Sequence, residues 1–374
     1  MAVVLALAVV MCGCERGATD TTGPDIPPLT DKRPCPIVHL TYADPNTIDP
    51  AWSGGIKDFS FIWTGESYHL FHITDPATGW TSRNGELSIG HASTPGLGEW
   101  TTHPCIDLLT DAAGWSPSFT WAPHVIKNDA DGLYYMFYTG VKWATGAPID
   151  AAEQRIGLAR SSDLMTWTPY DVNGEDGLIL DGPDHEEFPW SAFDTDGVSL
   201  PWEYDCRDPF IFDRGSSVTT DRYVMLASIR LAPDATSMAI AYATSDDLVS
   251  WQWQNYFPVT VGWKAESANL VERNGVFYLF WTKRGDADAV KVAFSTTGIF
   301  GSYAMTNGGD WLFGIANETL VEPQRTLYLA FDDAFFLHIK ADIVFPATPT
   351  YSSPVEITEV TGCSSDFPRP SEWF

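Results

Sequence analysis

The chain has 374 residues, a length that fits one large all-β domain or two ordinary domains. Its 49 acidic residues against 21 Lys and Arg give a net charge of −28, which argues against nucleic acid or an anionic membrane surface as a partner. The 16 Trp, 14 Tyr and 21 Phe are typical of β-strands, and the 26 Pro and 30 Gly are typical of many short strands joined by turns.

Residues 1–14 have the features of an export signal. An apolar run at residues 2–11 has the length of a signal-peptide core and is too short to span a membrane. The Met-Cys-Gly-Cys stretch that ends at Cys14 resembles the lipobox of bacterial lipoproteins, in which this cysteine carries a lipid. We therefore expect an exported protein, extracellular or periplasmic, that contacts a membrane only through a lipid at Cys14. Residues 15–45 are predicted to be a flexible tether.

Outside the signal, the cysteines are Cys35, Cys105, Cys206 and Cys363. An even number in an exported chain permits disulfides, and four cysteines allow three pairings. Cys35 and Cys363 flank the globular part, so a bridge that closes its two ends is one expectation. Buried thiols are the other. The spacing does not suggest a zinc site.

The body of the chain contains five similar units, each with a short apolar strand, a turn and a second apolar strand. The pairs are 57–63 with 67–72, 121–127 with 133–138, 207–213 with 222–227, 265–272 with 276–281 and, less clearly, 316–322 with 326–331. Four units continue with a third strand and an aromatic residue beyond it, at Trp100, Trp167, Trp251 and Tyr303.

Each unit therefore reads as a four-stranded antiparallel blade. Five blades predict an all-β, five-bladed β-propeller over residues 46–350, with residues 351–374 as a C-terminal tail that closes on it. A β-sandwich with chance similarity between units is the alternative.

Three acidic residues occupy matching places in this pattern. Asp58, Asp208 and Glu266 each lie where the first strand of a unit begins, in units one, three and four. The first strand of every propeller blade lines the central axis, so these side chains are predicted to meet in one axial pocket. Taken singly, each acid is more simply explained as a residue that caps a turn.

Motifs around these acids resemble those of the five-bladed glycoside hydrolases. Lys57-Asp58-Phe59 with residues 68–71 resembles the first-blade motif of families 43 and 62. Cys206-Arg207-Asp208-Pro209 is similar to a motif of families 32 and 68, and Ala265-Glu266-Ser267 resembles the fourth-blade motif of family 43, with Ser267 where that family has Gly. The resemblance covers most of residues 50–345 and implies a glycosidase that acts on an oligo- or polysaccharide.

The resemblance also implies roles for the acids. Glu266 would protonate the leaving oxygen, with its pKa raised by apolar neighbours and a second carboxylate. Asp58 would be the base of an inverting enzyme or the nucleophile of a retaining one. Asp208, kept ionised by Arg207, would modulate the pKa of the acid. An inverting enzyme acting on α-L-arabinofuranosides or β-xylosides is favoured, because the first unit is closest to families 43 and 62.

Further residues are candidates for substrate binding. Trp121 and His124 begin the second unit at the matching place, and Arg207 adjoins Asp208. No metal or cofactor is predicted at the site. The acidic loop at 181–187 with 194–197 leaves calcium open, although it lacks the full twelve-residue ligand pattern. The alternatives in function are a fructan-active or phosphorolytic relative and a non-catalytic sugar-binding propeller.

Overall fold

The structure is a computed structural model, and nearly all of its regular elements are β-strands. It describes residues 37–38, 40–42, 52–75, 86–95, 100–111, 113–143, 152–171, 174, 176–193, 205–233, 236–284, 289–306, 312, 314–321, 326–331, 337–340, 343–346, 348–353 and 355–357. Among these residues, the helical element is a single 3-10 turn, Pro258–Thr260. Within the same ranges, no helix is long and apolar enough to cross a membrane.

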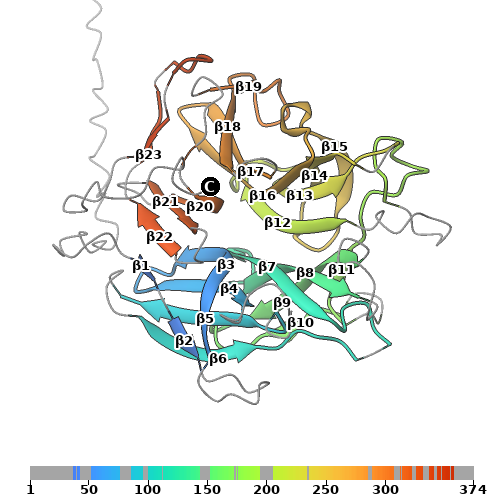
Figure 1. Cartoon of the computed structure of the whole chain (residues 1–374), viewed down its shortest axis with the longest axis vertical. Coiled ribbons are helices and arrows are strands. Elements are labelled where there is room, and N and C mark those ends of the chain that lie inside the picture. The colour runs from blue at the N-terminus through green and yellow to red at the C-terminus, as the bar shows by residue number, and fades with distance from the viewer. Residues whose placement is uncertain are drawn as a thin grey trace, which may run out of the picture.

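The strands form five antiparallel sheets of four or five strands, arranged as blades around one axis (Figure 1). Blade one contains β2 (Leu40–Tyr42), β3 (Trp52–Trp63), β4 (Tyr68–Asp75), β5 (Ile89–Thr94) and β6 (Thr101–Ile106). Blade two contains β7 (Phe119–Lys127), β8 (Tyr134–Lys142), β9 (Glu153–Ser161), β10 (Thr168–Pro169) and β11 (Leu178–Leu180). Blade three contains β12 (Cys206–Asp213), β13 (Tyr223–Arg230), β14 (Met238–Ser245) and β15 (Gln252–Tyr256).

The two remaining blades complete the ring. Blade four contains β16 (Lys264–Arg273), β17 (Val276–Arg284), β18 (Ala289–Ser295) and β19 (Ala304–Met305). Blade five contains β20 (Ile315–Val321), β21 (Thr326–Phe331), β22 (Leu337–Lys340) and β1 (Ile37–Val38). A separate ribbon pairs β23 (Ile343–Val344) with β24 (Glu356–Ile357).

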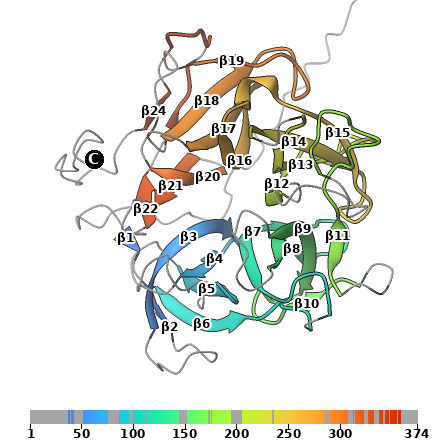
Figure 2. The same ribbon diagram turned by 45° about the vertical axis from the view of Figure 1, so that its right-hand side comes forward.

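The inner strands make a closed circuit. β3 contacts β7, β7 contacts β12, β12 contacts β16, β16 contacts β20, and β20 contacts β3. The all-β propeller that the repeated units predict is confirmed. Two short strands lie inside the segment predicted as a tether: β1 pairs with β22 at the edge of blade five, and β2 pairs with β3 (Figure 2). Pairing there covers an edge whose backbone groups would otherwise lack partners.

The sequence hallmark that follows each third strand has a structural basis. In blades two and three, a serine at the end of the third strand and an aspartate two residues later bind the backbone of a tight turn, and a leucine in the turn has positive φ. The tryptophan after this turn packs edge-on against a phenylalanine of the preceding blade. Trp167 lies 5.6 Å from Phe71, and Trp251 lies 5.7 Å from Phe137, between ring centroids.

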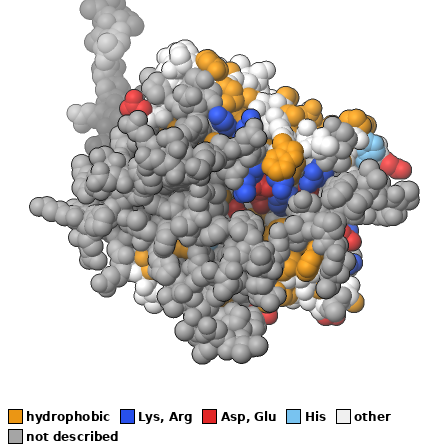
Figure 3. Space-filling view, in the orientation of Figure 1, with side chains coloured by type: hydrophobic (Ala, Val, Ile, Leu, Met, Phe, Trp, Pro, Cys, Tyr) orange, Lys and Arg blue, Asp and Glu red, His pale blue; other side chains and the backbone are white. Residues whose placement is uncertain are grey.

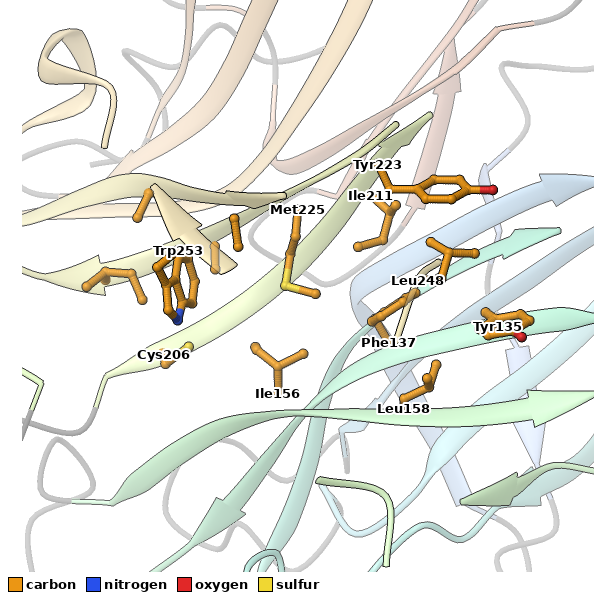
Figure 4. Close-up of a cluster of buried hydrophobic side chains, with 14 of the residues drawn as sticks. Tyr135, Phe137, Ile156, Leu158, Cys206, Ile211, Tyr223, Met225, Leu248 and Trp253 are labelled. Atoms are coloured by element: carbon orange, nitrogen blue, oxygen red, sulfur yellow. The ribbon is translucent and has the colours of Figure 1, made fainter. Parts of the chain in front are cut away.

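Apolar side chains fill the space between neighbouring blades. Figure 4 shows the cluster between blades two and three, where Phe137 and Ile156 face Met225 and Trp253. Cys206 belongs to this cluster as a free, buried thiol, which is one of the two expectations for the cysteines. Burial raises the pKa of this thiol. Cys35 and Cys363, the pair expected to form a bridge, lie outside the described residues.

Blade one also contains a chain of histidines that crosses β4, β5 and β6. Ser67 Oγ lies 2.9 Å from His69 Nε2, and His69 Nδ1 lies 2.9 Å from His91 Nε2. The rings of His91 and His103 are 4.5 Å apart, and His103 Nε2 is 2.7 Å from Ser93 Oγ. Burial, and to a smaller extent the neighbouring histidines, lower the pKa of His69 to about 4 and that of His91 to about 2. These rings are therefore neutral in the folded protein at neutral pH.

We expect this cluster to destabilise the fold as the pH falls. An unfolded histidine binds a proton near pH 6.5, and the folded ones bind it only at lower pH, so stability is lost as the pH falls from about 6.5. Between pH 7 and pH 5, the free energy of unfolding of His91→Gln should fall by about 2 kcal/mol less than that of the wild type, because each proton difference is worth ~1.4 kcal/mol per pH unit. The free energy of unfolding at both pH values measures this. His185→Gln, at an exposed site, is the control, and equal losses in all three proteins would contradict the prediction.

Candidate active site

The five inner strands share one irregularity, and it shapes the centre of the ring. The register of each inner strand with its neighbour shifts at one place, which marks a β-bulge. At each bulge one non-glycine residue has positive φ: Asp58 (33°), Ala122 (42°), Asp208 (58°), Ser267 (50°) and Ala316 (45°). Bulges re-aim side chains beside active sites, and a backbone in this region is strained for residues with a Cβ. The same strained turn is thus repeated five times around the axis.

The bulges surround one pocket. Its wall consists of the positive-φ residue of each inner strand and the one or two residues that follow it. Asp58 and Asp208, predicted from the sequence to meet on the axis, both line it, as does His124. In the space-filling view, acidic side chains lie near the middle of this face with basic side chains beside them (Figure 3).

Glu266 lies one residue before the bulge of β16, and Arg207 connects it to the pocket acids. Arg207 Nη2 donates to Glu266 Oε1 at 2.7 Å, and its Nε lies 3.8 Å from Asp208 Oδ2. Arg207 Nη1 is 3.1 Å from Asp205 Oδ1 and donates to Gln154 Oε1 at 3.0 Å. The three predicted acids therefore belong to one network, although Arg207 binds Glu266 more closely than Asp208.

Ser267 ties Asp58 to Asp208. Its backbone N–H donates to Asp208 Oδ2 at 3.0 Å, and its Oγ donates to Asp58 Oδ1 at 3.1 Å. Ser228 Oγ also donates to Asp208 Oδ2, at 3.2 Å. The serine that replaces glycine in the fourth-blade motif is thus a direct link between two carboxyl groups of the pocket.

The protonation states differ from those expected. Burial raises the pKa of Asp208 to about 7; Arg207 opposes this rise, and the charges of Asp58 and Glu266 add to it. Burial also raises the pKa of Glu266, but Arg207, Arg284 and Lys264 outweigh it, so that this pKa is lowered. The sequence predicts an ionised Asp208 and a raised pKa at Glu266, and the directions are reversed. Burial is the main cause at Asp208, and the nearby cations, Arg207 first, outweigh burial at Glu266.

The proposed substrate-binding residues have different surroundings. His124 lines the pocket, whereas Trp121 stacks on Phe119 with centroids 5.7 Å apart and is not among the described lining residues. Its position before the bulge directs it to the packing between Phe119 and Trp143. Arg207 is buried, and its role here is to bind acidic side chains.

Sequence reasoning missed the contribution of blade five, where Asn317 and Glu318 line the pocket. Asn269 of blade four was missed as well. When the five units are aligned by their bulges, Glu318 takes the position in unit five that His124 has in unit two. The repeat could therefore have indicated Glu318, but the motif of the fifth unit is weak.

No group of three or more His, Cys, Asp and Glu side chains suited to a metal occurs among the described residues. In the acidic loop weighed as a calcium site, Asp184 caps a turn by accepting from the backbone N–H of Glu186 at 2.8 Å. Residues 194–197, which would complete that loop, lie outside the described part of the chain.

No family model matches the sequence, and no curated protein does. Solved structures do resemble it. A GH32 β-fructofuranosidase from Bombyx mori gives a TM-score of 0.57 at 15% identity, over 87% of this chain and 66% of that one. An inulosucrase from Halalkalicoccus jeotgali bound to kestose gives 0.56 at 18% identity, over 83% and 82%. A thermostable family-43 glycoside hydrolase gives 0.55 at 15% identity, over 88% and 99%.

These likenesses establish the fold. The chain spans slightly less than two thirds of the Bombyx mori protein, and it matches nearly the whole length of the family-43 structure. At such low sequence identity the shared feature is the propeller, and the chemistry of the pocket must be argued from the residues of this chain.

Proposed function

We propose that this protein is a glycoside hydrolase that cleaves a glycosidic bond in an oligo- or polysaccharide. The observation that carries the proposal is that Asp58 and Asp208, from two blades, line one axial pocket, and that Arg207 links Asp208 to Glu266 of a third blade. Glycoside cleavage needs a proton donor for the leaving oxygen and a carboxylate at the anomeric carbon or on water. Asp208, whose pKa burial raises to about 7, can hold a proton near neutral pH, and Asp58 in the same pocket is the candidate carboxylate.

Asp58 is proposed as the base of an inverting reaction, with Glu266 as the acid and Asp208 as the group that modulates its pKa. A second assignment exchanges two roles: Asp208 is the acid, and Glu266 modulates its pKa. It is favoured by the pKa of Asp208, about 7, and by its place in the pocket wall, which together supply a proton at neutral pH. If Glu266 is the acid, Arg207 must release it so that it can hold a proton. If Asp208 is the acid, the contact between Arg207 and Glu266 can stay in place.

Leaving-group dependence separates the two assignments. Aryl α-L-arabinofuranosides and β-D-xylosides with good and poor leaving groups are to be tested on the wild type, Glu266→Gln and Asp208→Asn. A variant that lacks the proton donor should lose roughly 10²–10⁴-fold on poor leaving groups and much less on dinitrophenyl glycosides, which need little protonation. If the wild type hydrolyses none of these glycosides, nor the fructosides considered next, the proposed function is wrong.

A fructan-active enzyme is the second candidate function. The Arg207-Asp208-Pro209 stretch and the likeness to a β-fructofuranosidase and an inulosucrase favour it. Such an enzyme would use Asp58 as a nucleophile and retain the anomeric configuration. Sucrose and kestose as substrates, with the configuration of the first product followed by NMR, distinguish this candidate from the inverting one.

The proposal includes export and a lipid at Cys14. It rests on the apolar run at 2–11 and the cysteine that follows it, which lie outside the described residues.

A further inference from the structure

The wall of the pocket includes residues with polar atoms that no described residue of the protein satisfies. Asn317 is 4% exposed and Glu318 is 6% exposed, and both line the pocket. Among the described residues, neither Nδ2 nor Oδ1 of Asn317 has a hydrogen-bond partner, and Glu318 Oε2 has none. Buried polar groups are normally paired, so unpaired ones that face a cavity indicate a ligand.

Comparison with Asn269 shows that an unpaired side-chain amide is particular to Asn317 and not common to the asparagines of the pocket wall. Asn269, also in the pocket wall, has a partner at each polar atom: its Nδ2 donates to the backbone oxygen of Asn317 at 2.7 Å, and its Oδ1 accepts from Thr319 Oγ1 at 2.9 Å. These bonds hold β16 against β20 and fix the backbone that presents Asn317. The backbone of Asn317 is thus held by its neighbours, and neither the donor nor the acceptor of its side chain is used by the described residues.

Burial disfavours the charged forms of Glu318 and His124. Burial raises the pKa of Glu318 well above its usual value, more than hydrogen bonds from Ser60 and the Phe61 backbone lower it. His124 Nδ1 lies 3.7 Å from Glu318 Oε1, and burial lowers the pKa of His124 to about 3. The pair is therefore a neutral imidazole beside a carboxylic acid, and the acid offers a hydroxyl donor as well as an acceptor.

These groups define the ligand by its chemistry. The pocket offers donors and acceptors in pairs, which match hydroxyl groups, and no Lys or Arg is among its described lining residues. A sugar carboxylate would meet Asp58 there without a cation to balance it. We propose that Asn317 and Glu318 determine specificity by binding the hydroxyl groups of an uncharged sugar ring in the pocket, a role that rests on the proposed function.

Binding of free sugars tests this role without relying on turnover. Thermal shift and calorimetry on the full chain, in an Asp58→Asn background, would use L-arabinose, D-xylose, D-fructose, and D-glucose and D-galactose beside their uronates. We expect one or more neutral sugars to bind and the uronates not to. Asn317→Ala and Glu318→Leu should weaken that binding roughly tenfold each, the size expected for a lost hydrogen bond to a buried group. Glu318→Gln should bind within about twofold of the parent, because an amide keeps one donor and one acceptor.

Asn255→Ala, on an exposed position of the outer strand β15, is the matched control and should change nothing. The inference is overturned if none of the sugars binds, if a uronate binds as tightly as its neutral partner, or if Asn317→Ala binds like the parent. It is also overturned if a structure of the complex shows only ordered water at Asn317. Sugar binding with no hydrolysis would refute the proposed function alone, whereas hydrolysis with an unchanged KM in Asn317→Ala would refute this inference alone.

Discussion

Replacing Asp58 by asparagine is expected to lower kcat by about 10²–10⁴-fold, the range that a general base contributes. Asp58 lies at the bulge of β3 with φ of 33°, lines the pocket, and accepts a hydrogen bond from Ser267 Oγ at 3.1 Å. Asparagine keeps the shape and the hydrogen bond, but it cannot take a proton from water or attack a sugar. The loss should therefore fall on kcat and much less on KM.

The same substitution should change the titration of Asp208. The charge of Asp58 is one of the causes that raise the pKa of Asp208, after burial, so removing it should lower that pKa below about 7. Carboxyl ¹³C chemical shifts followed against pH measure this directly, and they do so whether or not a substrate is known. Glu66→Gln, in the exposed turn of the same blade, is the control. An Asp58→Asn enzyme with wild-type kcat would exclude Asp58 from the reaction.

Replacing Arg207 by methionine is expected to destabilise the fold by about 3–5 kcal/mol, as for a buried ion pair that loses one partner. Arg207 is 8% exposed and is the shared cation of Asp205, Glu266 and Asp208. Methionine fills a similar volume without the charge, and Glu266 then keeps Arg284, at 3.7 Å, as its nearest cationic partner. Chemical denaturation followed by tryptophan fluorescence gives the change in the free energy of unfolding.

Arg222 provides a matched comparison on the other end of the same hairpin. Its Nε and Nη2 donate to Asp213 at 2.9 Å and 2.7 Å, but this pair is partly open to solvent. Arg222→Met should therefore cost no more than about 1 kcal/mol. If Arg207→Met cost as little as Arg222→Met, the buried network around Arg207 would not contribute to the stability of the fold.

Much of the fold follows from local pattern. The pairing of apolar strands, the turns between them and the aromatic residue after each third strand recur along the chain, and they predict blades because each feature depends on residues close in sequence. Asp58 and Asp208 were placed in the pocket by the same reasoning, since ring closure brings equivalent strand positions to one axis. The strand β1 was missed, because a two-residue strand has no period of its own and forms only when β22 is beside it.

The chemistry of the site was decided by contacts between blades. Whether Asp208 or Glu266 holds a proton depends on which of them Arg207 contacts at 2.7 Å, and these residues come from different blades. The same holds for Asn317 of blade five, whose backbone is held by Asn269 of blade four while its side-chain amide has no partner among the described residues. Periodicity along the chain thus determined the blades and the positions of the acids. Charge, burial and free hydrogen-bonding capacity were decided by the closed ring, because they depend on groups that the sequence keeps far apart.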